Sequence, residues 1–366
     1  MKKTLAFLLG LAIATPMFAS EVAEPEANPA PQSAVSELLA KMPKVSGYLQ
    51  TGLNWNKVDG GKSSSSFEAK RLRLMVDGNV TKNLTFRLQI EAFNNTNSKA
   101  VNGQRNLQVM DAFATWAVKP SFKIRAGQFY TPMGFENYDI SPATLETVNF
   151  SDICYLMECR NAINQNYTDY GRDLGIMVFG DVLPSEEGFN YLSYNVALTN
   201  GAEQMKNDDN ASKDLMGAIT VRPIKHMMIK ASYNWGEYGP TYQPMNRFIV
   251  GAWYNNPTGL DLRAEFGMLS AKNAGADLVK EKGAYVLAGY HIGKWLPVAR
   301  WEMYKDDMNK ASKNNYNAIL AGVSYEVTKN FKLQANYIHK MYSDDAKAAL
   351  GYDSMNQVFL MSIFKF

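Results

Sequence analysis

The sequence contains few residues of the kinds that form catalytic or metal sites. Its 366 residues include only two cysteines and three histidines. His226, His291 and His339 lie far from Cys154 and Cys159 in the sequence, so a four-ligand zinc site is not expected. A hydrolase would need a histidine beside its nucleophile, whereas His291 falls at the predicted edge of a strand. We therefore predict a protein that is not an enzyme and that needs neither a cofactor nor a metal.

Long apolar runs and a strong excess of one charge are also missing. Beyond the first residues, no stretch approaches the roughly 18 consecutive apolar residues of a membrane-spanning helix. The formal net charge is only +3, from 38 basic and 35 acidic residues. Such a weak excess does not favour a nucleic-acid-binding protein. The sequence thus excludes a helical membrane protein and predicts no nucleic-acid partner.

The start of the chain has the pattern of a secretory signal peptide. Two lysines precede the apolar run Leu5–Ala14, and small residues follow around Ala19. We expect the signal peptide to cover residues 1–19, with Ser20 as a second cleavage position; an uncleaved anchor is the alternative, although the run is short for a span. Residues 20–44 are rich in Glu, Pro and Ala and are predicted to form a periplasmic extension or linker.

From residue 45 onward, apolar and polar residues alternate in segments of about ten residues separated by turns, which is typical of membrane strands. Short and long connections also alternate, as they do in barrels with short periplasmic turns and long external loops. A soluble barrel would show the same alternation with its polar face outside, so the signal peptide is needed to decide between them. The predicted strands are 45–57, 67–80, 84–96, 107–118, 122–130, 172–181, 189–199, 212–222, 226–237, 246–255, 259–270, 282–292, 295–305, 315–327, 330–342 and 353–366.

The chain therefore predicts an all-β fold, a sixteen-stranded antiparallel transmembrane β-barrel over residues 45–366. The final segment, 358–366, alternates aromatic and apolar side chains and ends on Phe366. Such a strand suits the element that closes the barrel against its first strand. We expect it also to be the contact for the outer-membrane assembly machinery, and the outward side chains to face outer-membrane lipid.

Three stretches resemble the phosphate-selective porin O and P family. They are Arg71–Gly78 (RLRLMVDG), Arg125–Glu136 (RAGQFYTPMGFE) and Gly171–Ile176 (GRDLGI). The resemblance implies a water-filled porin of the Gram-negative outer membrane that passes small hydrophilic solutes, is usually a homotrimer, and in some members prefers phosphate.

Strand parity turns more cationic than acidic side chains toward the lumen. Arginine suits anions because its planar fork donates two hydrogen bonds and stays charged. In the alternative, each cation simply pairs with a nearby carboxylate such as Asp77, Glu91 or Asp111. The candidate anion-binding residues are Arg71, Arg73, Arg87, Lys123, Arg125 and Arg300.

The longest connection, residues 131–171, is predicted to be a constriction loop and is strongly acidic. If it enters the lumen, its acids would oppose the basic wall, as in a general diffusion porin; alternatively they face solvent or bind divalent ions outside. Cys154 and Cys159 lie in this loop and are predicted to form a disulfide, since the compartment is oxidising. The candidate constriction residues are Tyr130, Phe135, Glu136, Asp139, Glu146, Asp152 and Glu158.

These features together predict passive transport across the outer membrane with a bias toward anions, phosphate among them. A non-selective diffusion porin is the first alternative. A structural or adhesive barrel with a plugged lumen is the second.

Overall fold

In the computed structural model, residues 43–366 form one compact unit. The predicted signal peptide and nearly all of the predicted linker lie outside the described residues, so both stay predictions. The structure describes residues 42–93, 107–159, 171–202, 204, 206–208, 210–272, 278–306 and 315–366.

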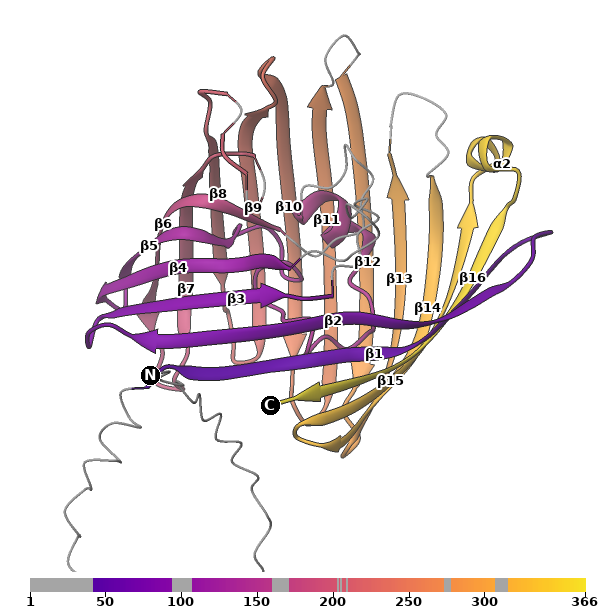
Figure 1. Ribbon diagram of the computed structural model, residues 1–366, viewed down its shortest axis with the longest axis horizontal. Helices are drawn as coiled ribbons and strands as arrows, with labels where there is room; N and C mark the ends of the chain where they lie inside the picture. Colours follow the sequence, from indigo (N-terminus) through magenta and orange to yellow (C-terminus); the bar gives the residue numbers. More distant parts are fainter. Residues whose placement is uncertain are drawn as a thin grey trace, which may run out of the picture. The chain divides into compact units, whose positions relative to one another are not determined.

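This unit is a closed antiparallel barrel of sixteen strands, in which each strand pairs with its neighbours in the sequence and β1 pairs with β16 (Figure 1). Each predicted strand coincides with one observed strand, which confirms the predicted fold class. The third strand is shorter than predicted and ends at Glu91. The strands are β1 Lys44–Val58, β2 Ser64–Asn79, β3 Leu84–Glu91, β4 Gln108–Lys119, β5 Phe122–Tyr130, β6 Arg172–Pro184, β7 Asn190–Thr199, β8 Asp214–Val221, β9 Met227–Tyr238, β10 Gln243–Asn255, β11 Leu260–Lys272, β12 Leu278–Tyr290, β13 Trp295–Lys305, β14 Tyr316–Thr328, β15 Phe331–Tyr342 and β16 Ser354–Lys365.

The barrel is closed by backbone pairing between its first and last strands. The amide of Gly47 donates to the carbonyl of Phe366, and the amide of Phe366 donates to the carbonyl of Gly47, each at 3.0 Å. Two aromatic rings, Phe331 on β15 and Phe364 on β16, stack with their centroids 4.5 Å apart beside this seam. Closure leaves no unpaired strand edge, which is the condition for a sheet that lies in lipid.

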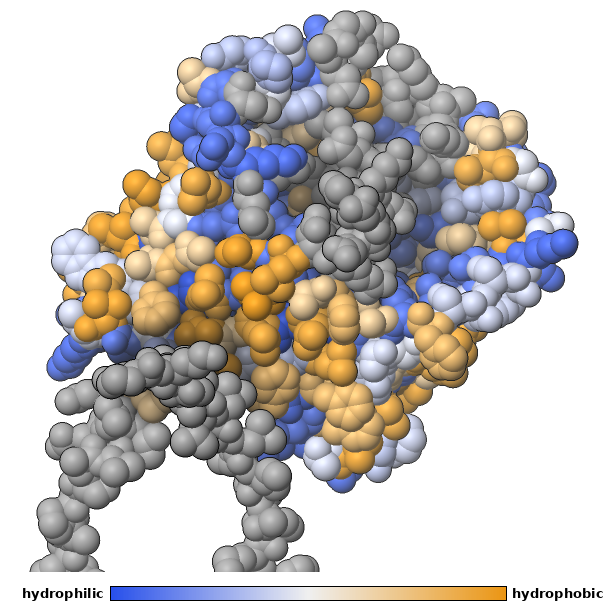
Figure 2. Space-filling model, in the orientation of Figure 1, coloured by the Kyte–Doolittle hydropathy of each residue, from blue (hydrophilic) through white to orange (hydrophobic). Residues whose placement is uncertain are grey.

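The two faces of the wall differ in polarity. Outward side chains such as Ile219, Trp235 and Phe266 are apolar and exposed, whereas inward ones such as Lys230 and Arg263 are polar and buried. Figure 2 shows apolar residues gathered on the outer surface of the strands. A soluble barrel would place its polar face outside, so this arrangement matches a barrel surrounded by lipid.

The two rims carry connections of different length. The turns from each even-numbered strand to the next odd one are short, while the connection from β5 to β6 spans residues 131–171. One long connection contains the helix α2, Asp344–Leu350, capped by Ser343 at its start and by left-handed Gly351 at its end. No helix in the described part of the chain has the length and apolar character needed to span a membrane. Outer-membrane barrels have their long loops on the external side, so the α2 rim is the external one.

Candidate functional site

The described part of the longest loop, residues 131–159, which we call the inner loop, lies inside the barrel. It contains a single π-helical turn, η2 (Cys154–Glu158). Apolar loop residues, among them Ile153 and Met157, pack in one cluster with inward residues of β10 and β11 such as Ile249 and Leu269. The inner loop is therefore fastened partly by burial of apolar surface against one side of the wall.

Two glycines make room for this packing. A Cβ atom at Gly267 on β11 would lie 2.7 Å from the Sδ of Met157, and one at Gly283 on β12 would lie 2.9 Å from the Cγ1 of Ile153. Both distances are shorter than ordinary contacts between carbon and its neighbours. The absent side chains at these two positions thus leave the space that η2 occupies.

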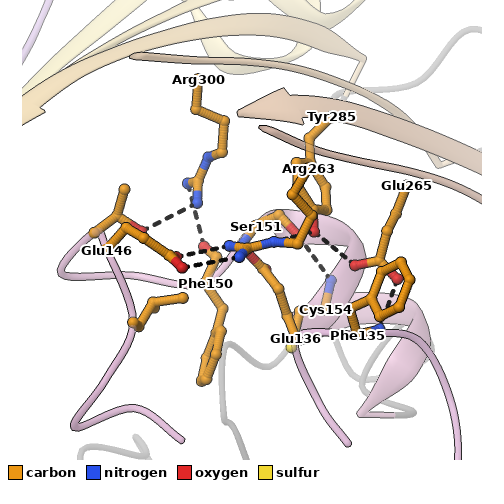
Figure 3. A network of polar contacts seen from close by, with 12 residues as sticks. Phe135, Glu136, Glu146, Phe150, Ser151, Cys154, Arg263, Glu265, Tyr285 and Arg300 are labelled. Carbon is orange, nitrogen blue, oxygen red and sulfur yellow. Dashed lines mark hydrogen bonds and ion pairs between the residues drawn. The ribbon is translucent and has the colours of Figure 1, made fainter. Parts of the chain in front are cut away.

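Arg263 on β11 holds two limbs of the inner loop together (Figure 3). Its guanidinium contacts Glu146 at 2.9 and 3.1 Å and Glu136 at 3.0 Å, and its Nε donates to the hydroxyl of Tyr285 at 2.9 Å. That hydroxyl donates to Glu265 at 2.6 Å. Burial opposes ionisation of Glu146, yet the charge and hydrogen bonds of Arg263 hold the pKa of that carboxyl below its usual value.

Further wall cations bind the inner loop along its length. Lys230 on β9 pairs with Asp139 at 2.7 Å, and Lys340 on β15 pairs with Asp152 at 2.8 Å. Arg300 on β13 donates to the carbonyls of residues 149 and 150 at 3.0 and 3.3 Å. Glu136, Glu146 and Asp152 therefore pair with cations on β11 and β15, outside the predicted arginine wall. Asp139 pairs with Lys230 and also lies on the side of the lumen where that wall stands.

Glu158 differs from the other loop acids because it has no basic partner among the described residues. Its Oε2 accepts from the amide of Asn137 at 2.9 Å, and its Oε1 has no hydrogen-bond partner there. Burial, together with the nearby carboxylates of Glu265 and Glu136, raises the pKa of Glu158 well above its usual value. Burial thus favours the uncharged form of this carboxyl.

The two cysteines are free thiols in the structure, so the predicted disulfide is not formed there. Their Sγ atoms are 3.9 Å apart, whereas a disulfide needs about 2 Å. They lie at the two ends of one π-helical turn, where the amide of Cys159 donates to the carbonyl of Cys154 at 2.8 Å. Burial raises the pKa of Cys154 well above its usual value, and the hydrogen bond with Cys159 adds to this. Closure of the pair by oxidation stays a prediction.

The predicted cationic wall exists on β2, β3 and β5, but most of its members carry a carboxylate partner. Arg73 contacts Glu91 at 2.8 Å, and Arg87 contacts Asp77 at 2.7 Å. Lys123 contacts a third carboxylate, on β6, at 3.0 Å. For these three cations the structure matches the alternative in which each pairs with a nearby acid.

Two other candidates have different surroundings. Arg71 is buried and donates to Gln50 at 2.5 Å, with its guanidinium 5.9 Å from the ring centroid of Phe150 in the inner loop. Arg300 contacts the inner loop rather than the wall of β2, β3 and β5. The structure therefore does not bring all six predicted cations together.

Arg125 on β5 is in none of the ion pairs found among the described residues. Its guanidinium lies 4.1 Å from the ring centroid of Phe113 and 4.9 Å from that of Phe179. Its Nε donates to the hydroxyl of Thr115 at 3.1 Å. The rings hold the guanidinium by cation–π contacts, which fix its position without cancelling its charge.

A cavity of about 820 Å³ lies between this wall and the inner loop, on the side of the short turns. Tyr130 lines it, as does Tyr138, whose pKa burial raises to about 12. Phe135, by contrast, is buried with its ring 5.8 Å from that of Trp253, so it anchors the inner loop. The charged residues that line the cavity are five cations, Lys44, Arg73, Arg87, Lys123 and Arg125, and three acids, Asp77, Asp111 and Asp139.

Arg172, at the start of β6, was not among the predicted site residues. It is buried, contacts Asp111 at 2.6 Å, and lies 3.5 Å from the ring centroid of Tyr130. Strand parity is undefined where a strand leaves a long loop, so alternation could not assign its direction. Its place in the Gly171–Ile176 stretch was the available indication.

The closed sixteen-stranded barrel, its polar interior and the loop folded into it define the class of porins. Similar solved structures include an anion-selective porin from Comamonas acidovorans (14% identity, TM-score 0.62, covering 88% of this chain and 99% of that one). OmpF of Salmonella typhi, solved with daunomycin, is 17% identical with a TM-score of 0.63, over 88% of this chain and 97% of that one. The channel DcaP of Acinetobacter baumannii is 12% identical with a TM-score of 0.57, over the same shares of each chain.

The family of phosphate-selective porins O and P matches residues 44–246, more than half of the chain, and the protein belongs to this family. No curated protein matches the sequence. The family and the fold are those of a channel rather than an enzyme. The protein is thus an outer-membrane porin through which small hydrophilic solutes diffuse.

Proposed function

We propose that the lumen favours small anions, and that Arg125 supplies most of this bias. The observation that carries the proposal is the charge of the large cavity, which five cations and three acids line. Arg73, Arg87 and Lys123 are each balanced by a carboxylate at 3.0 Å or less, whereas Arg125 is held by two rings and a hydroxyl. Its charge therefore acts on ions that pass through the cavity.

The same geometry favours a general preference for anions over a tight phosphate site. A phosphate site needs several donors that converge on one point and are not already engaged. Here Arg73, Arg87 and Lys123 already donate to carboxylates. We therefore propose that chloride, phosphate and small carboxylates pass by the same route, with phosphate bound weakly.

We also propose that the barrel assembles as a homotrimer in the outer-membrane lipid. One similar solved structure is a trimer form of OmpT from Vibrio cholerae, and the family resemblance favours the same state here. The outward apolar face of the wall suits both lipid and a neighbouring barrel. Sedimentation of the protein in detergent would measure this state, and a monomer that conducts normally would contradict the proposal.

The test of the anion preference is the reversal potential across a salt gradient in a planar bilayer. A unit charge about 7 Å from a passing ion is worth about 0.6 kcal/mol in water. Arg125→Gln should therefore lower the ratio of chloride to potassium permeability by about three- to sevenfold, since both ions are affected. Arg125→Lys should keep most of the preference because it keeps the charge.

Lys329→Gln is the matched control, since it removes the same charge from an exposed turn outside the cavity. An Arg125→Gln channel with the ion preference of the unmodified protein would refute the role of Arg125. A barrel that inserts but does not conduct would instead support the structural or adhesive alternative.

A further inference from the structure

Four lysines point away from the lumen where β11, β12 and β13 reach the external rim, which carries α2 (Figure 1). They are Lys272 and Lys280, which are exposed, and Lys282 and Lys305, which are half-buried. Successive side chains of a strand point to opposite faces of the sheet. The residues beside these lysines, Ala271, Glu281 and Tyr304, are buried on the lumen side, so the lysines face outward.

The register of the sheet brings the four lysines together. Lys282 on β12 and Lys305 on β13 are directly opposite partners. Lys280 lies two residues from Lys282 on the same face, about 7 Å along the strand. Its partner on β11 is Ser270, two residues before Lys272. The four ammonium groups can therefore gather over one small area of the outer wall, which we call the lysine patch.

The outer face of β11, β12 and β13 carries no carboxylate to compensate the lysine patch. The acids of these three strands are all buried on the lumen side: Asp261, Glu265, Glu281 and Glu302. None of the four lysines is in an ion pair among the described residues. Like charges directly opposite each other destabilise a sheet. The pair of Lys282 and Lys305 therefore lowers the stability of the barrel unless an anion binds beside it.

The lysine patch borders the apolar band of the outer wall. One outward position closer to the middle of the strands, Phe266, Ala284 and Met303 are partners across β11, β12 and β13. In an outer-membrane barrel the apolar band faces the hydrocarbon of the bilayer, and lipid headgroups lie just beyond its ends. The lysine patch is thus at the level of the headgroups of the external leaflet.

We propose that the lysine patch binds the phosphate groups of a phosphorylated glycolipid in the external leaflet. The phosphates would accept hydrogen bonds from Lys280, Lys282 and Lys305, and the acyl chains would lie along Phe266 and Met303. A lysine suits this role because its ammonium group has three donors and a full charge. A neighbouring barrel fits this face less well, because it would take four cations out of water. The lipid site is independent of the anion preference of the lumen.

Native mass spectrometry of the intact protein in detergent tests the proposal. The unmodified protein should bind bisphosphorylated lipid A more than about tenfold more tightly than the same lipid without its phosphates. Each basic residue near an anionic lipid surface contributes about fivefold to binding. Combining Lys280→Gln, Lys282→Gln and Lys305→Gln should therefore lower the affinity for lipid A about hundredfold. The dephosphorylated lipid should bind the variant and the unmodified protein equally.

A variant that loses the same charge at the opposite rim is the matched control. It combines Lys119→Gln, Lys225→Gln and Lys329→Gln, which remove exposed lysines at the short turns, and it should bind lipid A like the unmodified protein. Equal binding of the two lipids by the unmodified protein, or an equal loss in the two triple variants, would overturn the proposal. Displacement of lipid A by an equal concentration of inorganic phosphate would overturn it too, because the site would then be one for free phosphate.

Thermal unfolding gives a second measurement, which a general loss of stability would not reproduce. Lys282→Gln removes the like charge opposite Lys305, so in lipid-free detergent its melting temperature should be above that of the unmodified protein. Lipid A should reverse this order, because the unmodified protein gains more stability from the bound phosphates. A melting temperature of Lys282→Gln that stays above that of the unmodified protein in lipid A, or lies below it in both conditions, would contradict the proposal.

Discussion

Replacing Arg263 with methionine should release the inner loop from the wall. The substitution keeps an apolar stem of similar length but removes the charge that contacts Glu136 at 3.0 Å and Glu146 at 2.9 Å. Both carboxylates would remain in the interior without their cation. Breaking a buried ion pair in this way costs about 3–5 kcal/mol.

That cost is large compared with the thermal energy, and the loop can respond by moving away from the wall into the water-filled lumen. A loss of about 3 kcal/mol shifts the equilibrium between held and released loop more than about a hundredfold. Other contacts, such as Lys230 with Asp139, remain, so we expect frequent release rather than permanent opening. Single-channel recordings of Arg263→Met should show larger mean conductance and more current noise than the unmodified channel.

Two companion variants make the reasoning testable. Arg222→Met removes one charge from a side chain that donates to Ser193 rather than to the inner loop, and should record like the unmodified channel. Adding Glu136→Gln and Glu146→Gln to Arg263→Met should lower the current noise again in part, because the two carboxylates that lost their cation are then uncharged amides. Wild-type conductance and noise in Arg263→Met alone would show that this arginine does not hold the loop.

Three further predictions concern the same loop. Gly267→Val should displace η2 and raise the single-channel conductance. Gly217→Val should not, because an added Cβ there meets no atom within 4 Å. Equal conductance of the two variants would contradict the steric argument. Glu158 has a raised pKa, so its stabilisation of the folded loop should be complete below the ordinary carboxyl pKa of 4.5 and be lost as pH rises through the raised value. Protease sensitivity of the loop should therefore rise with pH, and Glu158→Gln should remove that dependence; a Gln variant with the same pH profile would exclude this group. Oxidation should join Cys154 and Cys159 and quieten the channel relative to a variant with serine at both positions, and identical traces would leave the disulfide without a role.

Local patterns were enough to predict the barrel. Alternation of polar and apolar residues and the short turns depend on neighbours in the sequence, and they gave all sixteen strands. The inner-loop contacts depend instead on pairs such as Arg263 with Glu136, which are separated by 127 residues and meet across the lumen. Nothing in a single sequence specifies which wall a loop will face. The sequence could therefore not show that Glu136, Glu146 and Asp152 pair with wall cations on β11 and β15.

The site residues were predictable to different extents. Parity correctly turned Arg73, Arg87 and Arg125 inward, but it could not show that Arg125 alone of these three would be without an ion pair among the described residues. Gly267 reads as an ordinary strand glycine until the path of the inner loop is known. Arg172 was missed because it stands at the junction of loop and strand.

The two glycines beneath η2 have a consequence for how such a channel can be altered. Gly267 and Gly283 carry no charge, and they set how deeply the inner loop sits in the wall. Arg125, to which we assign the charge preference, contacts Phe113, Phe179 and Thr115 and does not touch that packing. The proposal therefore implies that different residues control the cross-section of the passage and its electrical preference, and that a substitution can change either property while the other is kept.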